Sequence, residues 1–441
     1  MSALKPHTSY QMSDSACFGQ VPSHWSFHRL GQHFIERRET VSDEEYPPLS
    51  VTKAGIVPQL DTAAKTDNGD NRKGVIAGDF VINSRSDRKG SAGISDLDGS
   101  VSVISTVITP IDLDRKFVHH LLRSQPFQEE YYRFGSGIVA DLWSTRYSSM
   151  KNIKLPIPPL SEQRAIASYL DHETAEIDAF IGDQEELVEL LNERRAATIT
   201  QAVTKGLSPN APMKDSGISA IAPFPAHWLR EKLSRLGISQ ESGTSVNGYS
   251  DPDDMIGVRV LKTGCASKGV FDPSENKKVI EDDLRRVTCP VRPGALIVNR
   301  ANTPDLVGSS ALVVGEYPEL YLSDKLWQLD FSRSENRFMN WWMKTPAYRA
   351  QVKFHAVGAS ASMQNLSLSD FTSFAIALPP LSEQVEIADH LDFETAEIDS
   401  AIADAKEAIE LSKERRTALI SAVVTGKVDV RNHITSELGA A

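Results

Sequence analysis

Two short polar segments carry the side chains whose types and spacing are best suited to chemistry at a ligand. They occupy residues 83–90 and 299–303. Arginine can donate two hydrogen bonds to the edge of guanine, and asparagine or glutamine can pair in the same way with adenine. Small residues follow both segments, at Gly90 and Gly308, and allow a backbone to approach phosphate closely. Both segments therefore have the composition of a base-reading loop.

A second candidate segment lies further along each half of the chain, at residues 135–137 and 358–365. Glycine- and serine-rich segments of this kind are more often flexible connectors than ligand contacts. For the first pair of segments, the alternative is a solvated loop, or an arginine that pairs with a nearby aspartate to hold the fold. The candidate contact residues are Asn83, Ser84, Arg85, Arg88, Lys89, Asn299, Arg300, Asn302, Thr303, Gln364 and Asn365.

The sequence offers little for catalysis. It has no G-x-x-x-x-G-K-[ST] loop, and no Asn-Pro-Pro-aromatic or Asp-Pro-Pro-aromatic tetrapeptide of the kind that amino-methyltransferases use. Asp253 and Glu275 resemble the carboxylates of a Mg²⁺ nuclease, but both have turn-like neighbours. Cys17, Cys265 and Cys289 lack zinc spacing and are expected to be free thiols in a reducing cytoplasm. We therefore predict no catalytic residue, no cofactor site and no metal site.

The elements that must position the polar segments are also present twice. A short apolar strand is predicted at residues 80–85 and again at 295–300, and each ends in one of the polar loops. A Pro-x-His-Trp motif opens each of these regions and ends at Trp25 and at Trp228. We expect the tryptophans to be buried anchors rather than groups that stack on a base, and the histidines before them to be structural.

Two further segments are near-identical copies of each other. Pro-Pro-Leu-Ser-Glu-Gln at residues 158–163 recurs at 379–384, and Glu-Thr-Ala-Glu-Ile-Asp at 173–178 recurs at 394–399. The copies are 221 positions apart in both cases (158 to 379, 173 to 394), so no insertion interrupts the block. Gapless matching of this length indicates an internal duplication.

Each copy predicts a long helix, because its apolar residues recur at spacings of three, four and seven. The double proline excludes helix before Ser161 and Ser382, and these serines can cap the first turn, with Glu162 or Glu383 placed favourably against the helix dipole. Gly206 ends the first helix. Each helix would be roughly 60–70 Å long. So narrow an apolar stripe predicts that the copies pair with each other; two independent surface helices are the alternative.

The net charge of −12 argues against a simple basic DNA-binding protein. The acidity is concentrated in the two helical copies, with 10 acidic and 4 basic side chains in residues 161–206 and 12 acidic and 6 basic in residues 382–431. The remaining regions are balanced, so each can still present a basic face to phosphate. No apolar run is long enough to cross a bilayer, and no membrane association is predicted.

The duplication predicts an α+β fold with two globular α/β domains separated by two long helices, which form an antiparallel coiled coil about a pseudo-two-fold axis. Two unlike domains on such a frame would suit two unlike half-sites at a fixed spacing. The predicted boundaries are 1–157 for the first domain, 158–206 for the first helix, 207–378 for the second domain, 379–431 for the second helix and 432–441 for a C-terminal tail.

These motifs resemble the specificity subunit of type I restriction-modification systems. The resemblance rests on the Pro-Pro-Leu-Ser-Glu-Gln entry to each helix, the Glu-Thr-Ala-Glu-Ile-Asp core, the Glu-Arg-Arg exit at 193–195 and 414–416, and the Pro-x-His-Trp opening. It covers nearly the whole chain. The lead-in at residues 13–17 departs from the family pattern, whereas the lead-in at 213–217 matches it.

The resemblance implies a non-enzymatic subunit with two target-recognition domains, each reading one half of a bipartite site in double-stranded DNA. It also implies that adenine methyltransferase subunits, two in number, dock on the helices, and that restriction and translocation subunits are recruited for cleavage. A coiled-coil scaffold without DNA specificity is the alternative function. A self-contained Mg²⁺ nuclease at Asp253 and Glu275 is the third hypothesis.

Overall fold

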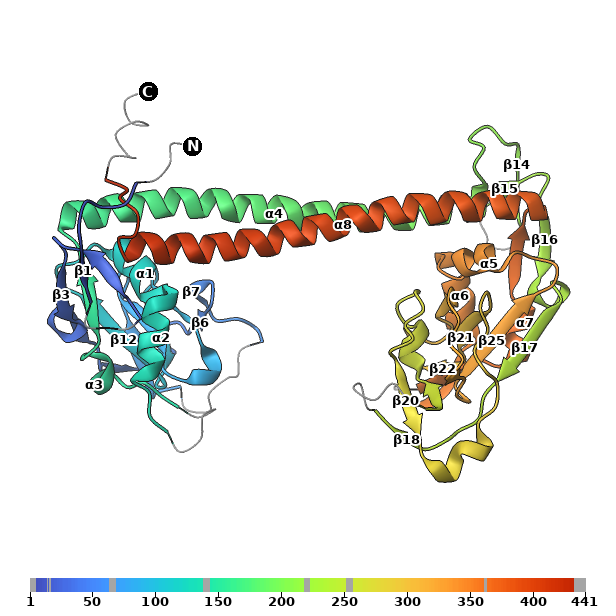
Figure 1. Ribbon diagram of the computed structural model, residues 1–441, viewed down its shortest axis with the longest axis horizontal. Helices are drawn as coiled ribbons and strands as arrows, with labels where there is room; N and C mark the ends of the chain where they lie inside the picture. Colours follow the sequence, from blue (N-terminus) through green and yellow to red (C-terminus); the bar gives the residue numbers. More distant parts are fainter. Residues whose placement is uncertain are drawn as a thin grey trace. The chain divides into compact units, whose positions relative to one another are not determined.

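The computed structural model describes residues 5–13, 15, 17–62, 69–137, 143–217, 223–250, 257–360 and 363–431. The chain divides into two compact units: unit 1 comprises Met1–Glu185 and Lys406–Ala441, and unit 2 comprises Glu186–Ala405. Each unit contains a globular part of strands and short helices, together with part of the long helices α4 (Leu160–Lys205) and α8 (Leu381–Val424) (Figure 1). The predicted α+β class with two long helices is confirmed.

The globular part of unit 1 contains the strands β1 (Tyr10–Met12), β2 (Gln20–Pro22), β3 (Ser26–Arg29), β4 (Phe34–Glu36), β5 (Thr40–Val41), β6 (Leu49–Thr52), β7 (Gly55–Pro58), β8 (Arg72–Val75), β9 (Phe80–Asn83), β10 (Ala92–Ile94), β11 (Gly99–Ser102), β12 (Ser105–Pro110) and β13 (Lys154–Ile157). Its helices are α1 (Arg115–Arg123), α2 (Gln125–Arg133) and α3 (Tyr147–Met150).

The globular part of unit 2 contains the strands β14 (Met213–Lys214), β15 (Phe224–Pro225), β16 (Leu229–Lys232), β17 (Ile238–Ser242), β18 (Gly248–Tyr249), β19 (Arg259–Leu261), β20 (Asn276–Val279), β21 (Leu296–Asn299), β22 (Ala301–Asn302), β23 (Ser310–Leu312), β24 (Leu320–Tyr321), β25 (Leu326–Phe331), β26 (Val357–Ser360), β27 (Met363–Asn365) and β28 (Ala375–Leu378). Its helices are α5 (Asn336–Trp342), α6 (Pro346–His355) and α7 (Leu368–Ser373).

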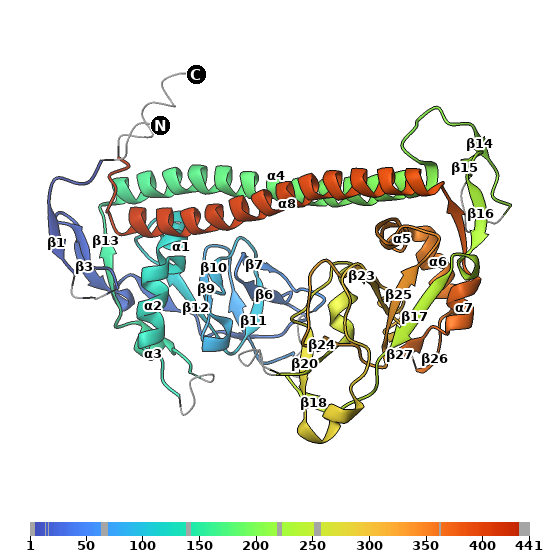
Figure 2. The same cartoon turned by 45° about the vertical axis from the view of Figure 1, so that its right-hand side comes forward.

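Both globular parts are built on a four-stranded antiparallel sheet with matching topology. The strand order is β10-β9-β12-β4 in unit 1, and the corresponding order in unit 2 is β23-β21-β25-β17. Figure 2 labels β9, β10 and β12 of the first sheet and β17, β23 and β25 of the second. The central strands β9 and β21 are buried at all four positions, which explains why they read as apolar runs ending in asparagine. The duplication seen in the helices therefore extends to the globular parts.

Short helices cover the sheets and join the cores of the globular parts to the long helices. In unit 1, Phe80 of β9 and Phe117 of α1 share one buried cluster with Ile166 of α4 and Val423 of α8. In unit 2, α5 and α6 are separate helices, because Thr345 caps a new helix that has proline in its first turn.

The long helices pair in antiparallel orientation within each unit. In unit 1, Arg416 of α8 donates two hydrogen bonds to the Asp178 carboxylate of α4, at 2.8 and 3.0 Å. In unit 2, Nε of Arg195 on α4 lies 3.0 Å from Oδ1 of Asp399 on α8. Each pair joins an early residue of one helix to a late residue of the other, and the two pairs occupy equivalent positions of the repeat. The predicted antiparallel pairing is confirmed.

The long helices begin two residues earlier than the capping prediction requires, at Leu160 and Leu381 instead of Glu162 and Glu383. The backbone N–H of Gln163 donates to the carbonyl of Pro159 at 2.9 Å, and that of Gln384 donates to Pro380 at 3.0 Å. Ser161 and Ser382 therefore lie inside the first turn, and the prediction that they cap the helices is wrong, because the proline carbonyls already accept the first helical bonds.

A glycine in the left-handed region follows the end of each long helix. Gly206 has φ of +73° and follows α4, and Gly426 has φ of +67° and lies shortly after α8. This conformation favours glycine and ends a helix by satisfying its last carbonyls. Cys17, Cys265 and Cys289 are free thiols, as expected. Within the described ranges, no helix is both long enough and apolar enough to span a membrane.

Candidate nucleic-acid interface

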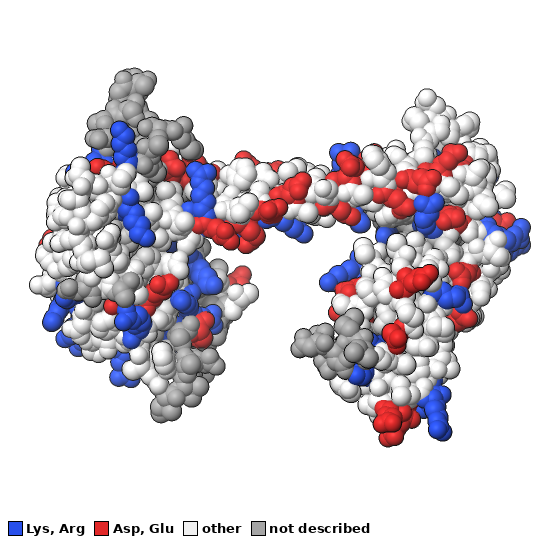
Figure 3. Space-filling model, viewed as in Figure 1, with Lys and Arg blue, Asp and Glu red and all other residues white. Residues whose placement is uncertain are grey.

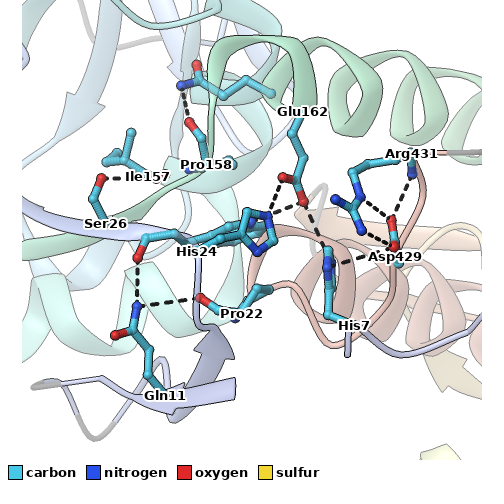
Figure 4. A network of polar contacts seen from close by, with 12 residues as sticks. His7, Gln11, Pro22, His24, Ser26, Ile157, Pro158, Glu162, Asp429 and Arg431 are labelled. Atoms are coloured by element: carbon cyan, nitrogen blue, oxygen red, sulfur yellow. Dashed lines mark hydrogen bonds and ion pairs between the residues drawn. The ribbon is translucent and has the colours of Figure 1, made fainter. Parts of the chain in front are cut away.

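The duplicated motifs hold the start of each long helix against its globular part. In unit 1, the Trp25 indole donates to Glu162 Oε1 at 3.1 Å, and His24 Nε2 lies 2.8 Å from Glu162 Oε2 (Figure 4). In unit 2, the Trp228 indole and the His227 ring contact Glu383 at 3.0 and 2.8 Å. Trp25 and Trp228 are buried, so the prediction that they are anchors rather than stacking groups is confirmed.

The glutamine that follows each of these glutamates fixes a second helix. The Gln163 side chain donates to the Pro158 carbonyl and accepts from the backbone N–H of Asp114, the N-cap residue of α1, with both distances 2.9 Å. The Gln384 side chain makes the same two bonds, to Pro379 and to Glu335, the N-cap residue of α5. The Glu-Gln pair therefore orients α1 and α5 on the long helices.

In unit 1, the first part of the candidate loop holds the loop in shape. Asn83 and Ser84 are buried. Asn83 Oδ1 accepts from the backbone N–H of Arg85 at 3.1 Å, and the Ser84 hydroxyl donates to the Ile104 carbonyl at 2.5 Å. These side chains position the residues that follow, and they are not turned toward a ligand.

Three cations are among the exposed residues of this loop. The side chains of Arg85, Arg88 and Lys89 are exposed to solvent. Arg88 Nε lies 3.7 Å from Asp87, and the Lys89 ammonium lies 5.2 Å from the centre of the Tyr132 ring. Ion pairs between exposed groups are weak, so these cations remain available to an anion.

Lys89 also lines a groove of about 440 Å³ where the globular part of unit 1 meets α8. Its other cations are Lys53, from the turn between β6 and β7, Arg123 at the end of α1, and Arg416 on α8. No aspartate or glutamate lines this groove among the residues that the structure describes. Figure 3 shows basic side chains on the globular part of unit 1 and acidic side chains along the helices.

The electrostatics of the groove favour an anion. Burial, and then the charge of Arg123, lowers the pKa of His119 to about 3, so this ring is neutral near pH 7. Burial, and then the like charge of Arg416, lowers the pKa of Arg123. Arg123 is held by His119 and by the Lys53 carbonyl, and Arg416 by Asp178. Lys53 and Lys89 are therefore the cations best placed to bind phosphate.

In unit 2, the first two polar side chains of the equivalent loop, Asn299 and Arg300, differ in burial. Asn299 is fully buried, and its amide donates to the Thr263 carbonyl and to the Ser309 hydroxyl at 3.0 and 2.7 Å, so it holds the strand end. The Arg300 guanidinium is half-buried 6.0 Å from the centre of the Trp327 ring. Its Nε atom is buried without a hydrogen-bond partner among the described residues.

The second candidate segment of unit 2 pairs with the first. Strand β22 pairs with β27, so that Ala301 faces Asn365 and Asn302 faces Gln364. Strand β26 completes this three-stranded sheet. This edge therefore carries Asn302, Thr303, Gln364 and Asn365 together, of which Thr303 and Asn365 are exposed and Asn302 and Gln364 are half-buried. The segment at 358–365 is a hairpin that extends the candidate surface rather than a connector, apart from Ala361 and Ser362, which lie outside the described residues.

Unit 1 repeats this arrangement in a shorter form. Arg85 and Ser136 each form an antiparallel bridge with Ser144, and the Thr145 N–H donates to the Ser84 carbonyl at 3.0 Å. In both units, the loop after the central strand is thus joined to the segment that precedes the last strand before the long helix. Sequence reasoning found both segments separately but did not predict that they meet.

Comparison with known proteins agrees with this duplicated architecture. The family model described as the type I restriction modification DNA specificity domain matches residues 23–189. The putative MjaX specificity subunit of Methanocaldococcus jannaschii is 24% identical over 416 residues, which cover 90% of this chain and 87% of that protein. The EcoKI specificity subunit of Escherichia coli is 24% identical over 277 residues, which cover 62% of this chain and 56% of that protein. Residues 23–189 therefore match the model of a DNA specificity domain, and 90% of the chain is similar to a type I restriction-modification specificity subunit.

Solved structures show that the fold of this chain is shared. A chain from a study of complex assembly and conformational transition in the type I restriction-modification system matches with a TM-score of 0.67 at 15% identity, covering 92% of this chain and 98% of that one. The specificity subunit from Thermoanaerobacter tengcongensis matches with a TM-score of 0.53 at 17% identity and the same coverage.

Proposed function

We propose that this chain is a specificity subunit that reads an asymmetric, bipartite target in double-stranded DNA, with one half-site for the globular part at residues 1–157 and the other for that at 207–378. The observation that carries the proposal is the duplicated polar surface. Each unit joins two polar segments at the same end of its central sheet, and the two surfaces carry different side chains. Two equivalent but unlike surfaces suit two unlike half-sites.

In unit 1, the contacts that we propose are Arg85, Arg88 and Lys89, with Lys53 binding phosphate in the neighbouring groove. In unit 2, they are Arg300, Asn302, Thr303, Gln364 and Asn365. Apart from Lys53, five of these side chains are exposed and the other three, Arg300, Asn302 and Gln364, are half-buried beside them, which supports direct reading of base edges. The groove cations support phosphate contact. The buried side chains Asn83, Ser84 and Asn299 are assigned to shaping the loops.

We further propose that the long helices are docking surfaces for methyltransferase subunits, one on each unit. In unit 1, α4 and α8 form an open groove of about 480 Å³, mostly apolar, which exposes Phe180 and Leu411. In unit 2, the equivalent face exposes Leu187 and Leu190, and Ala401 stands at the position equivalent to Phe180. Exposed apolar surface of this kind favours association with a partner.

The proposed subunit has no catalytic role of its own: base methylation belongs to the docked methyltransferase subunits, and translocation and cleavage belong to restriction subunits. The loop arrangement explains binding without requiring a reacting group. Asp253 of the nuclease hypothesis lies outside the described residues, and Glu275 adjoins the buried strand residue Asn276.

The test is selection from a random duplex pool by the complex of this chain with its methyltransferase subunit. Recovered duplexes should converge on one sequence with two defined halves and an undefined spacer. A pool that remains random after repeated selection, with the complex intact, would overturn the proposal and favour the scaffold alternative. Incubation of duplex DNA with Mg²⁺ and the chain alone tests the nuclease hypothesis: we expect no cleavage by the wild type, whereas cleavage that Asp253→Asn and Glu275→Gln abolish would support that hypothesis.

A further inference from the structure

Three potential metal ligands converge at the start of α4 in unit 1. They are His7 from the N-terminal segment, His24 from the turn between β2 and β3, and Glu162 from the first turn of the helix (Figure 4). Glu162 Oε2 lies 2.8 Å from His24 Nε2, and Glu162 Oε1 lies 3.6 Å from His7 Nε2. One ligand atom from each residue lies within 4.8 Å of the other two.

The geometry and chemistry of this cluster suit a transition-metal dication. Two imidazoles and a carboxylate form a ligand set used for Zn²⁺, with bonds of about 2.0–2.2 Å. Tetrahedral bonds of that length place ligand atoms roughly 3.3 Å apart. The contact of 3.6 Å between His7 and Glu162 is close to this spacing. The hydrogen bond between His24 and Glu162 would be replaced by bonds from both residues to the ion.

The surroundings of the cluster resemble the outer shell of a metal site. The His7 and Glu162 side chains are buried, at 3% and 4% exposure, whereas His24 faces solvent at 41%. His7 Nδ1 is buried without a hydrogen-bond partner and lies 3.9 Å from Asp429, which Arg431 holds at 2.6 and 2.9 Å. A ligating histidine usually directs its second nitrogen at such a carboxylate.

The second unit provides an internal comparison. His227, Trp228 and Glu383 repeat the contacts of His24, Trp25 and Glu162 at nearly identical distances. No third histidine, cysteine or acidic residue joins that pair in the described part of unit 2. The shared pair is therefore explained by its structural role at the helix start, but His7 and its buried, unpartnered nitrogen are not.

We propose that unit 1 binds one Zn²⁺ ion, or a similar transition-metal dication, through His7, His24 and Glu162, with Asp429 orienting His7. The ion would join the N-terminal segment to the start of α4. The Lys5–Asp429 bridge already pairs the N-terminal segment with the segment after α8, so the ion would stabilise both. Spacing in the sequence did not predict this site, because His24 and Glu162 are 138 positions apart and come together only in the fold.

The test is metal titration of the full chain, prepared without an affinity tag and freed of metal by a chelating resin. Calorimetry with Zn²⁺ should show one site per chain, and Co²⁺ should give visible absorption bands of tetrahedral coordination. His7→Gln should weaken Zn²⁺ binding by about 10-fold or more, and Asp429→Asn by about 10–100-fold. Zn²⁺ should raise the Tm of the wild type but not that of His7→Gln.

Two controls separate this site from other binding. His227→Gln changes the equivalent pair in unit 2, and His172→Gln changes the exposed cluster of His172, Glu173 and Glu176 on α4; neither should affect Zn²⁺ affinity. If His7→Gln does not fold, His24→Gln, with its exposed side chain, makes the same prediction. No binding by the wild type, or equal loss in the His227→Gln or His172→Gln variant, would overturn the proposal.

Discussion

Neutralising the two available lysines of the unit 1 groove should reduce the salt dependence of DNA binding. Lys53 and Lys89 line the groove without a carboxylate, whereas Arg123 and Arg416 are held by other groups. Each phosphate contact contributes about 0.9 to the slope of log affinity against log salt. The slope should therefore become shallower by about 1 in Lys53→Gln or Lys89→Gln and by about 2 in the double variant.

The assay is fluorescence anisotropy with the methyltransferase complex and a random 30-base-pair duplex, at several salt concentrations between about 50 and 200 mM. Because phosphate contacts are independent of sequence, the target need not be known. One contact changes affinity by roughly 3.5-fold across this range, so the loss in each single variant should shrink as salt rises. Lys151→Gln, which changes an exposed lysine after α3, is the control. An unchanged slope in the double variant would refute the assignment.

Three further predictions concern stability and assembly. Glu383→Ala removes the acceptor of the buried Trp228 indole and should lower the free energy of unfolding, measured in urea, by about 1–3 kcal/mol. Glu383→Gln keeps an acceptor, so it should lower that free energy by less. Equal losses of stability in the two variants would contradict the role of this hydrogen bond. Burial, and then Arg195, lowers the pKa of Lys344 from 10.5 to about 8. The folded state therefore pays the full cost of burying the charged ammonium below pH 8, and this cost falls as pH rises toward 10.5. Lys344→Met should be more stable than the wild type by about 2 kcal/mol at pH 7, and this difference should become smaller above pH 8. A difference in stability that does not depend on pH would contradict this. Phe180→Asp should weaken methyltransferase docking in sedimentation experiments without lowering the Tm, and unchanged docking would remove unit 1 from the proposed partner surface.

The helices and central strands could be predicted because their signals are local and periodic. The repeated Glu-Thr-Ala-Glu-Ile-Asp block indicated α4 and α8, and apolar runs ending in asparagine indicated β9 and β21. The capping prediction places the start of α4 two residues too late, because a proline carbonyl can accept the first helical bond although proline itself cannot donate. That difference placed Ser161 inside the helix.

The candidate site was predicted in outline but not in detail. The sequence predicts that an asparagine in a polar loop contacts a ligand, yet Asn83 and Asn299 are buried. Their side chains instead form hydrogen bonds with nearby backbone groups that would otherwise lack partners. Lys53 and Arg123 were missed because the groove brings together segments far apart in the sequence. Local patterns indicate the chemistry of a side chain, but its exposure depends on the fold.

The most direct test of the central claim is genome-wide mapping of methylated bases in cells that express this chain with its methyltransferase subunit. The wild type should methylate one motif with two defined halves. Arg85→Ala should relax specificity in one half only, and Arg300→Ala in the other half only. Methylation without a bipartite motif, or relaxation of the same half by both variants, would contradict the account of two separate reading surfaces.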